Sequence, residues 1–348
     1  MPLRVSVFLA VLIAGVGLGG VRTALDRSVP RAVTTPTVPV EAEAAAAPLV
    51  TSIPTTTTTL PPTTTTTAPP PPPSTTLPLA PPVRSVSMYN GLGTWIDVYD
   101  WSITFGKDGA LVDATTIDQM ARAGVQTLYV QTSKWDAPTD ILEPERLLPM
   151  IERARALGMR VVAWYLPTFE NPQADMARLM AASRLPVDAL AVDIESLKLR
   201  DVNERNRRLL EISTNLRREL PNVTLGAIPY PPVVTDVINP NLWPNFPWQE
   251  LAPLYDIWLP MSYQTDRKQE SGYRDAYRYM AENIDRMRAR LGANVPVHGI
   301  GGIADRTSPA DVDAIHRALL ERGATGGSLY DWRTTPPDLW PSLQKYRA

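Results

Sequence analysis

The feature that most constrains the fold is a regular alternation, from residue 90 onward, of short apolar runs and segments with helical periodicity. The eight runs have the length of buried strands: 95–99, 127–130, 160–164, 189–192, 224–228, 257–261, 295–300 and 327–330. The six segments with helical periodicity are 115–123, 144–157, 173–184, 202–220, 273–291 and 309–322. Continuous apolar runs are typical of parallel strands that are covered on both sides. Eight such strands in about 250 residues predict a single α/β (β/α)8 or TIM barrel.

Residues at the ends of the predicted helices agree with this division. Glycine, the usual residue after a helix C-terminus, follows four of them: Gly124, Gly158, Gly292 and Gly323. Asn171 and Ser308 stand at N-cap positions, each followed by proline. A doubly wound open sheet is the alternative, and it would place a glycine-rich phosphate turn after the first strand. Gly91 and Gly93 precede the expected first strand, and Gly299, Gly301 and Gly302 follow the expected seventh with no helix directly after them.

The N-terminal segment, residues 1–24, has the pattern of an export signal. Arg4 precedes an uncharged apolar run over residues 5–20, which is shorter than the ~20 residues of a typical membrane span and fits a secretory signal. Arg22 and Arg27 follow, without a small-residue cleavage site directly after the run. An uncleaved signal-anchor that tethers the chain through residues 5–20 is therefore the alternative. Both readings predict a secreted or extracytoplasmic protein.

Residues 25–84 form a low-complexity segment with threonine runs at 55–59 and 63–67 and a proline run at 69–73. Such a composition cannot bury enough apolar surface to fold, and it favours extended polyproline conformations. We expect a disordered linker or stalk. The chain therefore divides into a signal segment (1–24), a linker (25–84) and one barrel domain (85–348).

Composition excludes several classes of function. The formal net charge is −2 and no dense basic block is present, which argues against nucleic acid as a partner. The chain has no cysteine and only two histidines, His298 and His316, so a metal site built on those residue types is not expected. We expect no cofactor, a barrel that is stabilised by its core alone, and a monomer.

The predicted fourth strand carries the strongest functional signal, because it ends in two acids. Asp193 and Glu195 have one residue between them and therefore share a face of the strand. Burying a carboxylate is costly, and the C-terminal ends of barrel strands are where barrel enzymes hold their chemistry. Two neighbouring carboxyl groups can hold different protonation states, as glycosidic cleavage requires. We expect Glu195 to donate the proton and the deeper Asp193 to act as the ionised partner.

The other predicted strand ends carry acids and aromatic residues, a mixture that suits a sugar better than a phosphate. We expect the following residues to bind substrate: Asp97, Trp164, Tyr165, Tyr230, Tyr263, Gln264, Asp331 and Trp332. Two plainer readings stay open. In the first, Asp97 has a structural role and does no more than hydrogen-bond a neighbouring loop. In the second, the acids of the fourth strand form ion pairs at the barrel rim.

Two family resemblances rest on these residues. The sequence Asp188-Ala-Leu-Ala-Val-Asp-Ile-Glu195 resembles the fourth-strand signature of family-18 chitinases, Asp-x-x-Asp-x-Asp-x-Glu, with Ala191 in place of the second acid. Met261-Ser-Tyr263 is similar to that family's sixth-strand Met-x-Tyr-Asp, with Gln264 at the acid position. Trp332 resembles the tryptophan that forms the floor of the family's sugar subsite. The resemblance implies that Glu195 is the acid/base, that Asp193 orients an N-acetyl group and that Tyr263 supports it. The two departures argue against chemistry assisted by that group.

Residues 93–98, Gly-Thr-Trp-Ile-Asp-Val, together with Asp193-Ile-Glu195, are similar to family-25 lysozymes, which use a first-strand acid and an Asp-x-Glu pair. Both resemblances imply an exported glycoside hydrolase that cleaves a cell-wall or extracellular polysaccharide. The alternative is a non-catalytic carbohydrate-binding barrel at the cell surface, which Ala191 and Gln264 favour. A third reading is a structural envelope protein whose barrel is an inherited scaffold.

Overall fold

The computed structural model describes residues 84–106 and 111–348. The expected signal segment, and the expected linker up to residue 83, lie outside the described residues. Within the described part of the chain, no helix combines the length and the apolar character that crossing a membrane requires.

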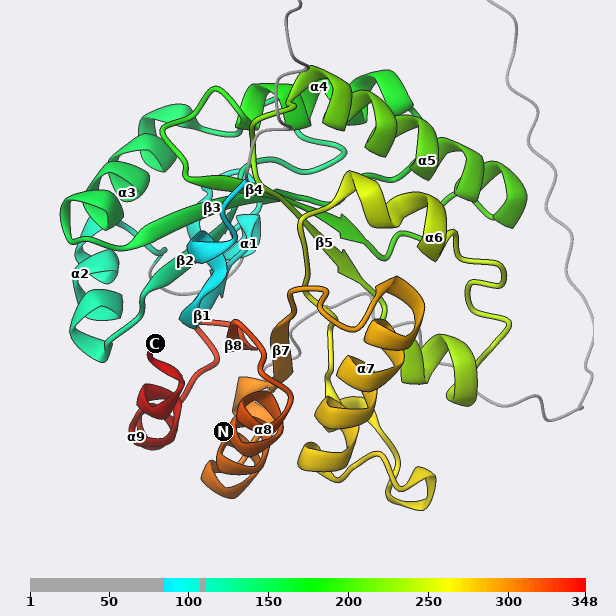
Figure 1. The fold of residues 1–348 in the computed structure, drawn as a ribbon. Coiled ribbons are helices and arrows are strands. Elements are labelled where there is room, and N and C mark those ends of the chain that lie inside the picture. Colours follow the sequence, from blue (N-terminus) through cyan, green and yellow to red (C-terminus); the bar gives the residue numbers. More distant parts are fainter. Residues whose placement is uncertain (1–83, 107–110) are drawn as a thin grey trace, which may run out of the picture. The chain divides into compact units, whose positions relative to one another are not determined.

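Eight parallel strands form the centre of the domain (Figure 1). They are β1 (Gly91–Ile96), β2 (Thr127–Gln131), β3 (Arg160–Tyr165), β4 (Ala189–Ile194), β5 (Leu225–Pro229), β6 (Ile257–Trp258), β7 (His298–Ile303) and β8 (Gly326–Tyr330). Their order in the sheet is β6-β5-β4-β3-β2-β1-β8-β7. Isolated parallel bridges from Trp258 to Val297 and from Met261 to Ile300 bring β6 beside β7. The predicted (β/α)8 barrel is thus confirmed, and an open doubly wound sheet is ruled out.

The helices surround the strands (Figure 1). The six predicted helices are all present as α2 (Ala114–Ala123), α3 (Pro144–Ala156), α4 (Pro172–Ala182), α5 (Val202–Glu219), α7 (Ala276–Leu291) and α8 (Pro309–Glu321). Three four-residue helices accompany them: α1 (Val98–Trp101), α6 (Trp248–Leu251) and α9 (Trp340–Leu343). Asn171 and Ser308 cap α4 and α8 through their side chains, as predicted. The helix α7 begins three residues later than expected, because Asp275 caps it by accepting from Arg278 N.

Two glycine-rich strands lie earlier or later than the sequence suggested. The expected first strand, 95–99, is in fact β1 at Gly91–Ile96, and the chain turns into α1 because Asp97 is its N-cap. Gly93 lies inside β1, where a Cβ would stand 2.5 Å from the Tyr129 ring. Gly299 lies inside β7, where the side chains of Met280 and Leu319 fill the space beside it. Glycine has low strand propensity, so the sequence pattern did not reveal these positions.

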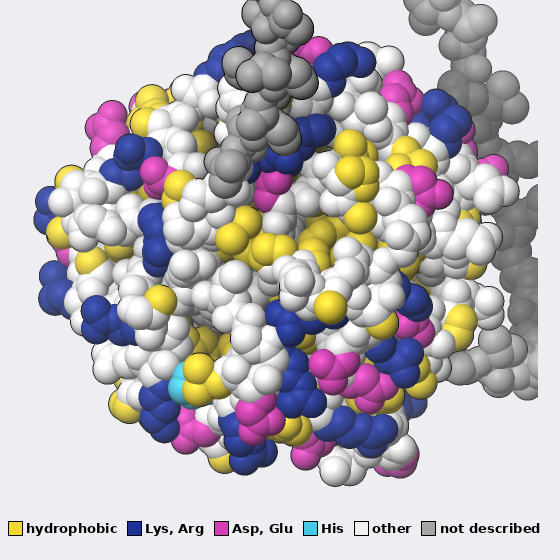
Figure 2. Space-filling model, in the orientation of Figure 1, with side chains coloured by type: hydrophobic (Ala, Val, Ile, Leu, Met, Phe, Trp, Pro, Cys, Tyr) yellow, Lys and Arg dark blue, Asp and Glu magenta, His cyan; other side chains and the backbone are white. Residues whose placement is uncertain are grey.

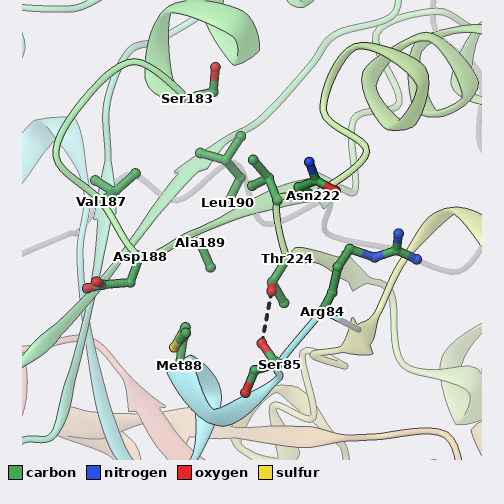
Figure 3. A pocket seen from close by; sticks show the side chains of 11 residues that line it. Arg84, Ser85, Met88, Ser183, Val187, Asp188, Ala189, Leu190, Asn222 and Thr224 are labelled. Carbon is green, nitrogen blue, oxygen red and sulfur yellow. Dashed lines mark hydrogen bonds between the residues drawn. The ribbon is translucent and has the colours of Figure 1, made fainter. Parts of the chain in front are cut away.

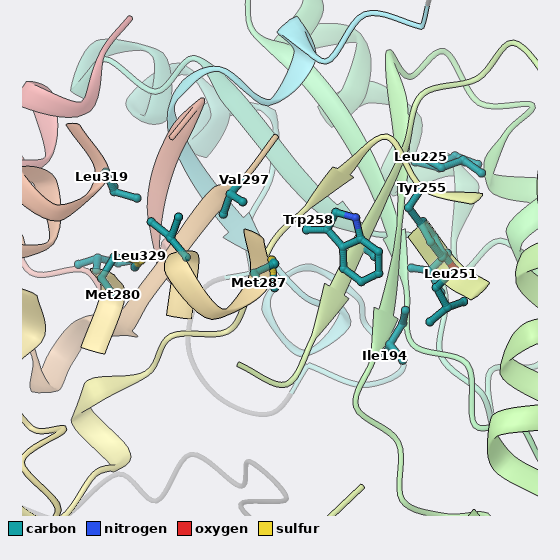
Figure 4. Close-up of a cluster of buried hydrophobic side chains, with 14 of the residues drawn as sticks. Ile194, Leu225, Leu251, Tyr255, Trp258, Met280, Met287, Val297, Leu319 and Leu329 are labelled. Carbon is teal, nitrogen blue, oxygen red and sulfur yellow. The ribbon is translucent and has the colours of Figure 1, made fainter. Parts of the chain in front are cut away.

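Side chains alternate between the barrel interior and the helical layer. The interior is filled by a cluster that includes Trp95, Tyr129, Val162, Trp164, Ala191, Ile228, Leu259, Ile300 and Tyr330. The outer faces of the strands pack against the helices in separate clusters; Figure 4 shows the largest, with Ile194, Trp258 and Leu329 among its members. On β4, Ala189 and Ala191 belong to the interior cluster, whereas Leu190, Val192 and Ile194 belong to the outer one. Strand alternation therefore aims Asp193 into the barrel, directly above Ala191.

The molecular surface carries charges of both signs. On the face seen in Figure 2, basic and acidic side chains are interspersed rather than gathered into one large area of a single sign. Many of these side chains form exposed ion pairs, such as Arg207 with Glu204 and Lys345 with Asp313. Pairs of this kind contribute little stability, so the barrel depends on its apolar clusters.

Candidate active site at the C-terminal ends of the strands

Asp193 and Glu195 stand at the C-terminal end of β4. Asp193 is 7% exposed, and its Oδ1 has no hydrogen-bond partner among the described residues. Glu195 is half-buried. Burial raises the pKa of Glu195 to about 7. Burial and the neighbouring Glu195 raise the pKa of Asp193 well above its usual range. Both shifts have the sign expected for carboxyl groups withdrawn from water.

These pKa shifts change the assignment made from the sequence. We expected Asp193 to be the ionised partner, yet its deeper position and its unpartnered oxygen raise its pKa beyond the usual range. The pair therefore retains a proton near neutral pH, and Glu195 ionises as the pH rises through about 7. A ligand N–H or O–H that donates to Asp193 Oδ1 would stabilise the ionised form of that carboxyl.

Two tyrosines lie beside this pair. Burial and the charges of Glu195 and Asp193 raise the pKa of Tyr230, at the end of β5. The same causes, in the same order, raise the pKa of Tyr263, which follows β6. Both phenols thus stay protonated at all ordinary pH values and can donate hydrogen bonds. The structure brings together four residues that the sequence analysis selected from three different strand ends.

A second group of acids lies at the ends of β1 and β8. One carboxylate oxygen from each of Asp97, Asp100 and Asp331 lies within 4.8 Å of the others, and all three side chains are buried. Burial raises the pKa of all three, and that of Asp331 reaches about 6 because the charge of Asp97 adds to the effect. Asp97 is the N-cap of α1 and accepts from Tyr99 N at 2.7 Å. Asp100 completes the capping box by accepting from Asp97 N at 2.9 Å.

This acid group is the one place, among the described residues, where carboxylates gather closely enough to hold a cation. Its oxygens already accept hydrogen bonds from backbone N–H groups and from Thr334 Oγ1, and the guanidinium of Arg333 lies 3.8 Å from Asp100. These contacts hold the three carboxyl groups together around the N-terminus of α1.

Tyr330, the last residue of β8, lies beside the second acid group. Its hydroxyl donates to Asp97 Oδ2 at 2.7 Å. Its ring centroid lies 6.2 Å from that of Tyr263 and 6.4 Å from that of Trp95. Sequence reasoning missed Tyr330. The signal was available, because strand alternation puts it on the same face as Ser328, whose hydroxyl accepts from the interior Trp95.

Trp164 and Tyr165, both selected from the end of the third strand, lie on opposite faces of β3. The Trp164 ring packs edge-on against Trp95 with centroids 5.9 Å apart, and its Nε1 has no partner among the described residues. The hydroxyl of Tyr165 donates to Asp175 on α4 at 2.7 Å, within the outer layer. Tyr165 is thus a packing residue, and the sequence selection of Tyr165 was wrong because adjacent strand residues cannot share a face.

Gln264 and Trp332 contact residues outside the β4 pair. Gln264 is fully buried, and a Cβ on Gly302 of β7 would stand 2.7 Å from its Nε2, so the amide lies beside that strand. The ring of Trp332 packs against Trp340 of α9 with centroids 5.0 Å apart, and against the cluster beneath α2 and α3. Alternation ends at Asp331, which accepts from Thr334 and Thr335 in a turn. Tyr330 therefore occupies the interior position that we had expected Trp332 to hold.

A pocket of about 270 Å³ lies at the opposite end of the barrel (Figure 3). It is bordered by Asp188 and Leu190 at the start of β4 and by Thr224 before β5. Thr224 Oγ1 donates to the carbonyl of Ser85 at 2.8 Å. This hydrogen bond connects the segment that precedes β1 to the N-terminal end of β5. The pocket contains none of the acids of the candidate active site.

The chain matches no family model and no curated protein. Several solved structures are similar to it. The spore cortex-lytic enzyme SleL of Bacillus cereus has a TM-score of 0.53 and 9% identity over 74% of each chain. A class V chitinase of Pseudomonas fluorescens has a TM-score of 0.52 and 9% identity, covering 74% of this chain and 99% of the other. An endo-1,4-beta-mannanase of Rhizomucor miehei has a TM-score of 0.50 and 10% identity, covering 70% and 85%. The chain thus has the TIM-barrel fold that glycoside hydrolases use.

Proposed function

We propose that this barrel hydrolyses glycosidic bonds in a polysaccharide, with Glu195 as the proton donor and Asp193 as its partner. The observation that carries the proposal is a pair of carboxyl groups at the C-terminal end of a barrel strand, of which Asp193 is buried and Glu195 is half-buried with its pKa raised to about 7. An acid of this pKa is protonated in a substantial fraction of molecules at neutral pH. The shared fold with a chitinase, a mannanase and a cortex-lytic enzyme supports the same class of reaction.

The reaction assigned to the pair is a simple exchange of bonds. Glu195 gives its proton to the glycosidic oxygen while the bond from that oxygen to the anomeric carbon breaks. Asp193 stabilises the positive charge that develops on the sugar ring, and substrate donors at its Oδ1 favour the ionised form that this role needs. Water then adds to the anomeric carbon, and its proton returns to a carboxylate of the site.

The remaining interior residues shape the sugar-binding surface in this proposal. The rings of Trp164 and Tyr330 pack against the buried Trp95, and we assign to these two rings the surface against which a sugar stacks. The hydroxyls of Tyr230 and Tyr263 donate hydrogen bonds to the substrate or to the β4 pair. Asp97 and Asp331 accept from sugar hydroxyls at the β1 and β8 side. For Asp97, this role comes in addition to its capping of α1.

A non-catalytic carbohydrate-binding barrel is the second candidate, and two observations favour it. Ala191 stands in the apolar interior, where the family-18 signature has an acid. Gln264 is an amide, so it supplies no carboxyl group at the acid position of the sixth-strand motif. Such a barrel would bind a glycan between the same aromatic rings and release it unchanged.

We also propose that the domain works outside the cytoplasm. The support comes from the sequence: an apolar run at residues 5–20, followed by a Thr/Pro-rich segment that reaches the first residues of the barrel. This arrangement would either release the protein after cleavage of the signal or hold it at a membrane through residues 5–20. The proposed substrate is accordingly a cell-wall or extracellular glycan.

The two candidates differ in turnover. The purified full-length chain is incubated with insoluble peptidoglycan, chitin, mannan and cellulose, and new reducing ends and bound protein are both measured. The matched variant is Glu195→Gln, which keeps the shape of the side chain but cannot donate the proton. A hydrolase releases reducing ends from one polymer, and the variant does not. A binding module is retained on one polymer, releases nothing, and is unaffected by the substitution.

A further inference from the structure

An exposed cluster of aromatic and basic side chains lies on the rim of the barrel beside the proposed active site. We call it the rim cluster: Phe105, Lys134, Trp135, Glu170 and Lys198. These residues come from the segments that follow α1, β2, β3 and β4, all at the C-terminal end of the barrel. Trp135 is 41% exposed, which is unusual for so large an apolar side chain. The roles assigned above to the interior residues do not involve this cluster.

Two ammonium groups lie close to the ring of Trp135, which is also partly open to solvent. Lys198 Nζ lies over it, 2.9 Å from the ring centroid, and Lys134 Nζ lies 4.9 Å away. Lys134 Nζ is also 4.8 Å from the centroid of Phe105. A cation over an aromatic face is attracted to it without losing its charge. A sugar that approaches this ring therefore meets the ammonium group of Lys198 on one of the two ring faces.

The carboxylate partner of Lys198 is weakly held. Glu170 Oε2 lies 3.5 Å from Lys198 Nζ, and the Glu170 side chain is 50% exposed. Exposed pairs of this kind are worth little, so an incoming anion can take the place of Glu170. The more enclosed Lys134 keeps its own partner, Asp136, in the same loop. Lys198 is thus the cation available to a ligand, and Trp135 fixes its position.

We propose that the rim cluster is a subsite for a carboxylate carried by the glycan, so that the preferred substrate contains acidic sugar units. This inference rests on the proposed function, since it names the substrate class of the same site. Lys198 follows Glu195 by three residues, which limits the separation of their Cα atoms to about 11 Å. The carboxylate would therefore sit on a sugar unit close to the bond that Glu195 cleaves. The ligand chemistry is that of a uronic acid or of a lactyl ether on an amino sugar.

The test measures binding without turnover, using the full-length chain with Glu195→Gln. The probes are polygalacturonate oligosaccharides and peptide-free peptidoglycan strands, each compared with the same material after chemical reduction of its carboxyl groups. The added substitutions are Lys198→Gln and Trp135→Phe, and the matched control is Lys345→Gln, an exposed lysine near the C-terminus that pairs with Asp313. Binding is measured by calorimetry at two salt concentrations, and folding by circular dichroism.

We expect one carboxylated probe to bind roughly tenfold more tightly than its reduced form. Lys198→Gln should remove that difference, Trp135→Phe should reduce it, and Lys345→Gln should leave it intact. The probe that binds distinguishes the uronic acid from the lactyl ether. Equal affinity for carboxylated and reduced probes, an unchanged preference in Lys198→Gln, or no binding of either carboxylated probe overturns the inference. If carboxylate-dependent binding is seen but the wild-type chain releases no reducing ends, the proposed hydrolysis fails and the subsite stands.

Discussion

At the scale of single residues, the surroundings of the carboxyl groups decide the chemistry. Glu195 is half-buried and has a pKa near 7, while Asp193 is deeper and leaves one oxygen without a partner. The sequence placed both acids on one face of a strand, because residues two apart on a strand share a face. It could not reveal that the pKa values of both acids would be raised, since burial depth and the lack of a hydrogen-bond donor are properties of the packed barrel.

The first prediction concerns the pH dependence of hydrolysis. A proton donor works only in its protonated form, so activity is present below the pKa of Glu195 and is lost as the pH rises through about 7. We expect kcat/KM to fall about tenfold per pH unit above that point. The measurement is a pH profile on the glycan that the polymer panel identifies. A profile that is flat between about pH 5 and pH 9 would rule out Glu195 as the acid.

At the scale of helices and strands, the sequence predicted which elements form. It did not predict the boundaries of every strand, nor which side chains at the strand ends point into the barrel. Several helix ends could be predicted, because Asn171, Ser308 and Gly124 carry their own capping chemistry, whereas the start of α7 was expected three residues too early. Gly91 and Gly93 gave no strand signal, so β1 was expected too late in the chain. Selecting both Trp164 and Tyr165 ignored strand alternation. The position of Trp332 follows from a turn at Asp331, whose hydrogen bonds cannot be read from spacing.

The second prediction concerns the contact between β8 and β1. A Cβ on Gly326 would stand 2.5 Å from Gly91 O and 2.6 Å from Tyr89 O, which are backbone atoms with no room to move. A Cβ on Gly327 would instead approach the side chains of Leu319 and Tyr346, which can move more easily than backbone atoms. We expect Gly326→Ala to lower the free energy of unfolding by more than roughly 3 kcal/mol, and Gly327→Ala by about 1–2 kcal/mol. Urea unfolding followed by tryptophan fluorescence checks this, and equal losses would contradict the closure described here.

At the scale of the whole molecule, the barrel concentrates buried acids at one end. The pKa values of all five acids are raised because the carboxyl groups are withdrawn from water, wholly in Asp97, Asp100, Asp193 and Asp331 and partly in Glu195. Each favours the folded state below its unfolded pKa, and that stabilisation is lost as the pH rises through its folded pKa. His298 acts in the opposite sense, since burial lowers its pKa to about 4 and stability falls as the pH drops from 6.5 toward 4. The site thus reduces the stability of the fold at alkaline pH.

The third prediction is therefore a stability profile. We expect the wild-type chain to be more stable at pH 5 than at pH 8.5, because Glu195 with a pKa of about 7 and Asp331 with a pKa of about 6 ionise between these values. Glu195→Gln should raise the stability at pH 8.5 by on the order of 1–3 kcal/mol, or several °C in Tm, with a smaller effect at pH 5. Calorimetric scans at both pH values make the comparison. An equal shift of the Tm of the variant at both pH values would show that burial does not raise the pKa of Glu195.

The most direct measurement compares two leaving groups. A nitrophenyl glycoside of the substrate sugar leaves without protonation, whereas the unactivated oligosaccharide needs an acid. If Glu195 is the proton donor, Glu195→Gln should cleave the oligosaccharide at least ~100-fold more slowly than wild type and retain most activity on the nitrophenyl glycoside. An equal loss on both substrates, or no loss on either, would contradict the role assigned to Glu195.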